Sequence, residues 1–138
     1  MILTNKQGKC NISKLVLAYI GIPRMMSVKE IDATTLKEMM DNNEDICLYD
    51  VRSQAEFAQG IIRGGEFAPL HTIPVKMHDL PKDKTIVFYC RSGARSAQAC
   101  MYVAENTGIE ALNLRGGIIS WYQSGNEVIK PDEMQANG

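Results

Sequence analysis

Short apolar runs alternate with helix-like segments from Ser27 onward, and this alternation constrains the fold more than any other feature of the sequence. Residues 45–51 and 85–90 read DICLYDV and TIVFYC, continuous apolar runs typical of strands that are covered on both faces. Helix-like segments separate them, which requires crossover connections and a mainly parallel sheet. The pattern predicts a three-layer α/β domain with helices on both sides of the sheet.

Capping and turn residues predict the remaining elements. We expect a helix over residues 34–45, started by a capping box from Thr35 to Glu38. The other expected helices cover 53–60, 72–80, 94–108 and 117–125, and the other expected strands lie in 64–70 and 111–116. The chain thus divides into an N-terminal extension (1–26), one domain (27–130) and a frayed C-terminal tail (131–138). Two alternatives stay open for the extension: an added amphipathic helix, or a natural start at Met25 or Met26.

Length and charge exclude several classes of function. The chain has 138 residues, the size of one domain, and its 15 basic and 16 acidic residues give a net charge of −1. This balance provides no electrostatic reason for binding nucleic acid or an anionic membrane. The longest apolar run, Leu15–Ile22, is far shorter than the ~20 residues of a spanning helix. Lys9 and Lys14 before that run keep a signal peptide as an alternative, but no small-x-small cleavage site follows.

The cysteines indicate a reactive thiol rather than a zinc site or a disulfide framework. The four cysteines contain no C-x-x-C pair, and the chain has two histidines, so no zinc pattern exists and we predict no metal or cofactor. A chain this large and apolar does not need a disulfide framework. We therefore expect a cytoplasmic, reducing location and at least one cysteine that is kept for a reaction.

Cys90 is the candidate, because it ends a predicted strand and is followed by RSGARS and a helix. The first N–H groups of a helix lack intrahelical partners, and with the amides of a tight loop they form a concavity for an anion. Gly93 lets the backbone curl, and Arg91 and Arg95 add positive charge. The amides of the loop and helix and the positive charge of the arginines both favour the nucleophilic thiolate of Cys90. The alternative is a buried, inert cysteine at a strand end, but two arginines and a glycine are poor core residues.

The other cysteines and the histidines have simpler interpretations. Cys100 follows Cys90 by more than two helical turns on an apolar helix face, which disfavours a resolving role. Cys47 lies within a buried strand, and Cys10 lies in the N-terminal extension. Neither His71 nor His78 has an obvious partner in the sequence.

Four segments, in order, resemble the rhodanese-like sulfurtransferases from Ser27 to about Lys130. Residues 49–60 (YDVRSQAEFAQG) are similar to the family's D-x-R-x-x-x-E-[FY]-x-x-G segment, and residues 60–70 (GIIRGGEFAPL) to its G-H-I-x-G-A-x-N-x-P-[LI] stretch. Residues 85–96 (TIVFYCRSGARS) resemble its strand and active-site loop, and residues 114–121 (LRGGIISW) its closing G-G-x-x-x-W. Each segment is weak evidence alone, but four in the right order are specific.

The resemblance implies a five-stranded, mainly parallel sheet flanked by helices and a catalytic Cys90 that carries a persulfide. It implies transfer of a sulfane sulfur from a small anionic donor, thiosulfate or a persulfide or polysulfide, to a thiol, cyanide or protein acceptor, in a monomer or weak dimer. The residues implied to bind the substrate and cradle the sulfur are Arg91, Ser92, Gly93, Ala94, Arg95 and Ser96. Asp50 and Arg52 match the family's D-x-R, and we interpret them as a supporting pair that orients the loop.

The sequence departs from the family pattern at several points. Ile61 replaces the histidine of G-H-I, and Gly65 replaces the following alanine. The loop CRSGAR is neither the thiosulfate loop C-R-K-G-V-T nor the mercaptopyruvate loop C-G-[ST]-G-V-[TS], so the donor stays open.

Three other functions are compatible with a domain of this kind. A phosphatase or arsenate reductase of this fold needs C-x-x-x-x-x-R, whereas Arg95 comes one position too early. A persulfide carrier, for which small-molecule turnover is incidental, would use the same residues and stays open. A non-catalytic regulatory domain is disfavoured, because such domains usually lose the cysteine.

Overall fold

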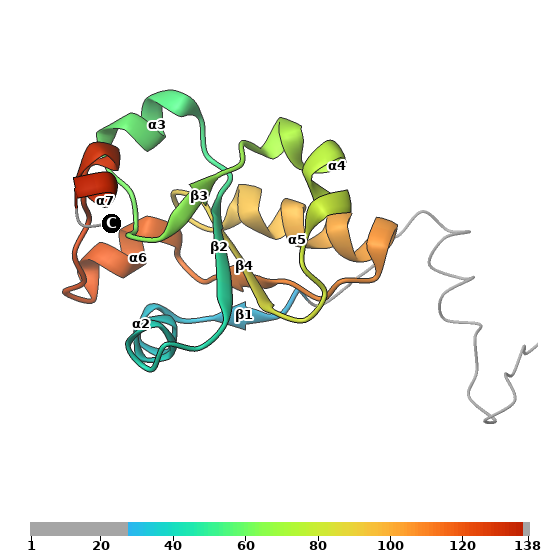
Figure 1. Ribbon diagram of the computed structural model, residues 1–138, viewed down its shortest axis with the longest axis horizontal. Coiled ribbons are helices and arrows are strands. Elements are labelled where there is room, and N and C mark those ends of the chain that lie inside the picture. Colours follow the sequence, from blue (N-terminus) through green and yellow to red (C-terminus); the bar gives the residue numbers. More distant parts are fainter. Residues whose placement is uncertain (1–27, 137–138) are drawn as a thin grey trace, which may run out of the picture.

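The computed structural model describes residues 28–136, which form one sheet covered by helices on both faces (Figure 1). The strands are β1 (Glu30–Ile31), β2 (Ile46–Asp50), β3 (Gly65–Phe67), β4 (Thr85–Tyr89) and β5 (Leu112–Leu114). They lie in the order β1-β5-β4-β2-β3, and every pair is parallel. The five-stranded parallel sheet flanked by helices is thus confirmed. β1 has only two residues, too few to produce a sequence pattern.

The helices are α2 (Ala33–Asp41), α3 (Gln54–Gln59), α4 (Ile73–Lys76), α5 (Ala94–Thr107), α6 (Gly117–Gln123) and α7 (Pro131–Ala136). Two single 3₁₀ turns, η1 (Leu70–Thr72) and η2 (Met77–Asp79), flank α4. In Figure 1, α4 and α5 lie on one side of the sheet, and α2 and α6 lie on the other. Each side has its own apolar core, so side chains of β4 pack in both: Phe88 against α5, and Val87 against α2 and α6.

β4 lies at the centre of the sheet, between β5 and β2. Its residues from Ile86 to Tyr89 are at most 1% exposed, as the continuous apolar run predicts. Burial on both faces and on both edges fixes the end of β4, and Cys90 follows directly. The predicted nucleophile therefore directly follows a buried central strand.

Two local predictions were wrong. Asp32, not Thr35, caps α2: its carboxylate accepts the Thr35 N–H at 2.7 Å, so the helix begins at Ala33. A carboxylate is favoured there because it also meets the positive end of the helix dipole. Residues 72–80 form a single helical turn, α4, continued by the 3₁₀ turn η2, rather than one helix.

The C-terminal segment predicted to be frayed forms a helix, α7. Pro131 occupies its first position, where a fixed φ favours helix, and two acidic residues follow in the first turn. The sulfur of Met134 accepts a hydrogen bond from the Gly64 N–H at 3.2 Å, which attaches α7 to the loop before β3. This contact joins residues 70 positions apart, so no local sequence pattern predicts that the segment is ordered.

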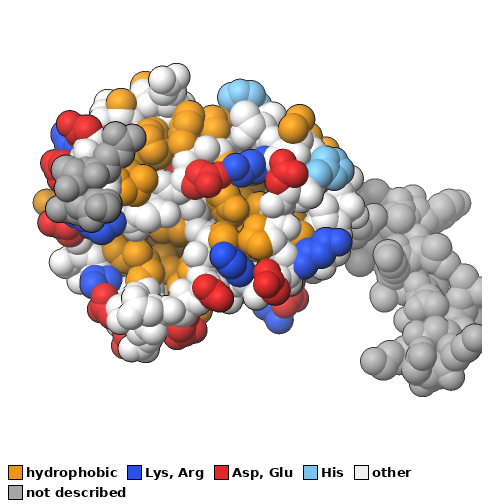
Figure 2. Space-filling model, viewed as in Figure 1, with side chains coloured by type: hydrophobic (Ala, Val, Ile, Leu, Met, Phe, Trp, Pro, Cys, Tyr) orange, Lys and Arg blue, Asp and Glu red, His pale blue; other side chains and the backbone are white. Residues whose placement is uncertain are grey.

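The expectations for residues 1–26, an added helix or a later start, lie outside the described residues. Within residues 28–136, no helix has both the length and the apolar composition needed to cross a membrane. Figure 2 shows basic and acidic side chains interspersed over the face in view, without a large field of one sign.

Candidate active site

The sulfur of Cys90 lies at the carboxyl end of β4, surrounded by hydrogen-bond donors. Cys90 is 1% exposed. The Gly93 N–H donates to its Sγ at 3.0 Å, and the Ser96 hydroxyl lies 3.4 Å from the same atom. Burial raises the pKa of the Cys90 thiol, but the Ser96 hydroxyl and the N–H groups of Ser96, Gly93 and Ser92 outweigh it and lower the pKa. The site therefore favours an anionic sulfur.

The loop after Cys90 is held in place by α6. Gly93 caps α5 with a left-handed backbone (φ +107°), so the chain curls around the sulfur before the helix begins at Ala94. The N–H groups of Ile118 and Ile119 donate to the carbonyls of Cys90 and Arg91 at 2.9 and 3.2 Å. Gly117 permits this contact, because a Cβ there would lie 2.3 Å from the Arg91 carbonyl oxygen.

The two loop arginines lie in different settings. Arg91 is exposed. Arg95 forms a bidentate ion pair with Glu56 of α3, with N–O distances of 2.7 and 2.9 Å. The hydrogen bond from Arg95 holds the pKa of Glu56 at about 2, and Glu56 in turn raises the pKa of Arg95. Much of the charge that the sequence assigned to anion binding is therefore matched by a carboxylate. No local pattern in the sequence indicates this pairing, because the two residues lie 39 positions apart.

Asp50 and Arg52 form the predicted pair, and it is buried. Arg52 Nη2 lies 2.6 Å from Asp50 Oδ2 and also donates to the Gly60 carbonyl at 2.7 Å. Its guanidinium lies over the Tyr89 ring, 5.6 Å from the centroid. Within the described chain, the hydrogen bonds of this pair do not reach residues 91–95. The pair connects the ends of β2 and α3 to the last residue of β4, at the base of the loop.

Asn113 of β5 is a site residue that sequence reasoning missed. It is 2% exposed, and its Oδ1 accepts from the Ser96 hydroxyl at 2.5 Å. Its Nδ2 donates to the Gly93 carbonyl at 3.1 Å. The available signal was the polar residue within the apolar run ALNL.

The remaining thiols lie away from this network. Cys47, Cys90 and Cys100 are free cysteines, and Cys10 lies outside the described residues. Burial raises the pKa of Cys100 to about 12, which makes it a poor nucleophile.

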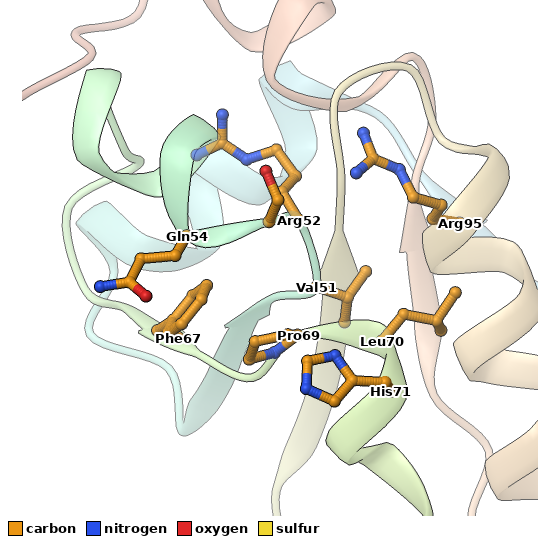
Figure 3. Close-up of a pocket in the computed structure, with 9 residues that line it drawn as sticks. Val51, Arg52, Gln54, Phe67, Pro69, Leu70, His71 and Arg95 are labelled. Carbon is orange, nitrogen blue, oxygen red and sulfur yellow. The ribbon is translucent and has the colours of Figure 1, made fainter.

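A pocket of about 590 Å³ borders the Cys90 loop at Arg95. Figure 3 shows Arg95 at one end of this pocket and Phe67 at the other, with Val51, Pro69 and Leu70 between them. His71, for which no partner was evident from the sequence, lines the same pocket. The pocket is apolar with a cationic end, which suits a ligand that is larger than a simple anion.

The geometry as a whole suits nucleophilic attack by sulfur. A buried thiol with a lowered pKa lies among backbone donors that stabilise negative charge without moving. The loop places a single sulfur atom at the focus of these donors.

Residues 32–124 match the family of rhodanese-like domains. The chain is 46% identical over 105 residues to a sulfurtransferase of Allochromatium vinosum, covering 76% of this chain and 98% of that protein. It is 42% identical over 96 residues to YtwF of Bacillus subtilis, provisionally named a sulfurtransferase, covering 70% and 92%.

A more distant relative is YrkF of Bacillus subtilis, provisionally named a sulfur carrier protein, at 26% identity over 69% of this chain and 51% of that protein. The crystal structure of a rhodanese-like domain protein from Staphylococcus aureus superposes with a TM-score of 0.65 at 33% identity, over 74% and 98% of the two chains.

Proposed function

Because the chain belongs to the family of rhodanese-like domains and is 46% identical to a relative named a sulfurtransferase, we propose that it transfers a sulfane sulfur through a persulfide on Cys90. The observation that carries this proposal is the set of donors around the Cys90 sulfur: the Gly93 N–H at 3.0 Å and the Ser96 hydroxyl at 3.4 Å. The lowered pKa of Cys90 supplies the thiolate that the first step needs.

In the first half-reaction the Cys90 thiolate attacks the outer sulfur of an anionic donor. With thiosulfate, a new bond forms between Sγ and that sulfur, the sulfur–sulfur bond of thiosulfate breaks, and sulfite leaves with the bonding electron pair. The product is a Cys90 persulfide anion. Loop residues 91–96 would cradle its outer sulfur, and their N–H groups replace water as donors to the negative charge.

In the second half-reaction an acceptor attacks the outer sulfur. A thiolate or cyanide forms the new bond to that sulfur, and Cys90 leaves as the thiolate, which regenerates the free protein. The same donors that lower the pKa of Cys90 also make it a good leaving group.

We propose that Arg91 and Arg95 attract the anionic donor, whereas Asp50 and Arg52 orient the loop through Tyr89. Arg91 is exposed and available for this role. Arg95 is paired with Glu56, so an anion must share Arg95 with this carboxylate. The Asp50–Arg52 pair is less than 7% exposed at both side chains, which suits a structural role.

A persulfide carrier is the second candidate function. The name of the relative YrkF and the apolar pocket next to Arg95 favour it, because a protein acceptor needs a surface larger than cyanide does. In a carrier the persulfide forms as readily, but discharge to small acceptors is slow.

Mass spectrometry before and after incubation with thiosulfate, polysulfide or glutathione persulfide tests the proposal. The expected result is a gain of one sulfur atom that a reductant removes, located on the tryptic peptide 85–91, TIVFYCR, in which Cys90 is the only cysteine. Cys90→Ser should gain none, and Cys100→Ser should gain it normally. Wild-type protein that takes sulfur from none of the three donors would contradict the proposal.

The rate of discharge separates the two functions. An enzyme returns its persulfide to the thiol rapidly when cyanide or glutathione is added. A carrier keeps the sulfur until a protein thiol is supplied.

A further inference from the structure

The amide of Asn113 makes hydrogen bonds on all sides within a nearly closed site. Its Oδ1 accepts from Ser96, and its Nδ2 donates to the Gly93 carbonyl at 3.1 Å and to Glu30 Oε2 at 3.3 Å. A buried polar side chain in an apolar strand costs stability unless it is fully paired, and an apolar residue would serve a core better. The arrangement therefore requires an explanation beyond packing.

Two of the partners of Asn113 belong to residues that also donate to the Cys90 sulfur. The Gly93 N–H and the Ser96 hydroxyl lie 3.0 and 3.4 Å from Sγ. Asn113 donates to the carbonyl of Gly93 and accepts from the hydroxyl of Ser96. It therefore acts on the sulfur through both of these residues.

The Ser96 hydroxyl has one proton and two possible acceptors. Its oxygen lies within hydrogen-bond distance of both Asn113 Oδ1 and Cys90 Sγ. An amide oxygen is a stronger acceptor than an uncharged thiol, so with a neutral Cys90 the proton goes to Asn113. Hydrogen bonds to an anion are about twice as strong as those between neutral groups. When the sulfur becomes anionic, the hydroxyl gains by turning toward it.

We propose that Asn113 is a positioning residue that competes for the Ser96 hydroxyl proton and so sets how strongly this hydroxyl donates to the sulfur of Cys90. A neutral amide suits this task, because it releases the hydroxyl when the sulfur is charged. A carboxylate at this position would retain the proton and would also repel an anionic sulfur. The inference rests on the proposed role of Cys90, but its test requires no sulfur donor.

Charged side chains around this network come from several elements. Glu30 of β1 accepts from Asn113 and lies 3.2 Å from Arg115. Arg95 of α5 is paired with Glu56 of α3, and Arg91 lies in the loop. None of these is changed in the variants below, so their influence is common to all measurements.

The test is a double-mutant cycle read as the reactivity of Cys90. The alkylation rate with iodoacetamide is followed from pH 5 to 10 on the tryptic peptide 85–91, which reports Cys90 alone. In the wild type, Ser96→Ala should reduce the rate about tenfold at pH values below the pKa of Cys90, because one donor to the thiolate is lost and this pKa rises by about one unit. Asn113→Asp should also reduce the rate about tenfold.

The decisive comparison is Ser96→Ala within the two Asn113 backgrounds. Added to Asn113→Asp, it should change the rate less than twofold, because the carboxylate already holds the hydroxyl. Added to Asn113→Ala, it should cost at least as much as in the wild type, because no acceptor competes with the sulfur. Equal fold changes in all backgrounds would overturn the proposal and leave Asn113 as a packing residue.

Controls separate this effect from added charge and from misfolding. Asn106→Asp adds the same charge at an exposed position on α5 and should leave the rate within twofold of the wild type. Thermal unfolding shows which variants are folded. If only one of Asn113→Ala and Asn113→Asp folds, the effect of Ser96→Ala in that variant is compared with its effect in the wild type. A cycle that shows coupling while no persulfide forms contradicts the proposed function only.

Discussion

At the level of single residues, backbone groups do much of the work on the Cys90 sulfur. N–H groups of Ser92, Gly93 and Ser96 lower the pKa of the thiol although burial opposes them. The backbone at the start of the loop is fixed as well, because the carbonyls of Cys90 and Arg91 accept hydrogen bonds from α6. The donors are thus aimed before any substrate arrives, which is the condition for effective electrostatic stabilisation.

Gly117 provides a test of this backbone contact. A Cβ at this position would lie 2.3 Å from the Arg91 carbonyl oxygen, and its φ of +62° disfavours other residues. We expect Gly117→Ala to lower the free energy of unfolding by roughly 2–4 kcal/mol, because strain and a backbone clash combine. It should also slow persulfide formation, measured as sulfur gained per minute by mass spectrometry.

Gly125→Ala is the matched control. Gly125 has a similar left-handed backbone (φ +88°), but no atom lies within 4 Å of a Cβ there. It should cost only about 1 kcal/mol in urea unfolding and leave sulfur loading unchanged. Equal losses in the two variants would show that conformational strain alone, not the contact with Arg91, explains the effect.

At the level of elements, α3 and α5 are joined by the Glu56–Arg95 ion pair next to the Cys90 loop. Glu56 also completes a capping box with Ser53, so the same side chain starts α3 and binds α5. Both helices were predicted from the sequence, but Arg95 was expected to attract the substrate and to lower the pKa of Cys90, not to pair with Glu56. Because α5 begins in the loop after Cys90, the ion pair connects α3 to the position of that loop.

This ion pair should contribute pH-dependent stability. The Arg95 hydrogen bond lowers the pKa of Glu56 from 4.5 to about 2. A depressed carboxyl pKa gives stability that is present above pH 4.5 and is lost as the pH falls toward 2. Because both side chains are partly exposed, screening reduces the effect to about 1 kcal/mol.

Urea unfolding at a series of pH values measures the effect. Wild-type stability should decline more steeply between pH 4.5 and 2 than that of Glu56→Gln, which lacks the titrating group. Glu44→Gln, at an exposed position, serves as the control and should follow the wild type. Identical slopes for wild type and Glu56→Gln would mean that the pair adds no stability in solution.

At the level of the whole molecule, the C-terminal segment completes the fold. Ile129 is 3% exposed and pairs with Ile61 in an isolated antiparallel bridge, with N–O distances of 2.7 and 2.9 Å. Trp121 donates to the Glu127 carbonyl at 2.9 Å. The predicted domain end at residue 130 therefore retains these contacts, whereas an earlier end would lose them.

Two truncations test that boundary. A chain ending at Lys130 loses α7 and its contact from Met134 to Gly64, and should lose only about 1 kcal/mol because a thioether is a weak acceptor. A chain ending at Asn126 loses Ile129 as well and should lose about 2–5 kcal/mol. Thermal unfolding compares them; a large loss for the first would place α7 within the domain.

Much of the fold followed from the sequence, because burial on both faces leaves a local signature. β2 and β4 read as continuous apolar runs, and Gly108 marked the end of α5. β1 was not predicted, because two residues are too few for a pattern. α7 was not predicted either, because the partner of Met134 lies 70 positions away in the sequence. The cap of α2 was misplaced by three residues, because Thr35 and Glu38 match the capping-box pattern whereas the folded chain uses Asp32.

The sequence by itself determined the layered parallel sheet and singled out Cys90, because strand hydrophobicity, the loop glycine and the following helix are all local features. Only the tertiary structure decided how the sulfur is surrounded. Asn113 reaches Ser96 across 17 positions, and Glu56 reaches Arg95 across 39. Such partners are selected by the packing of β5 and α3 against the loop, and hydrogen bonds of this kind form wherever folded geometry brings donor and acceptor within about 3 Å.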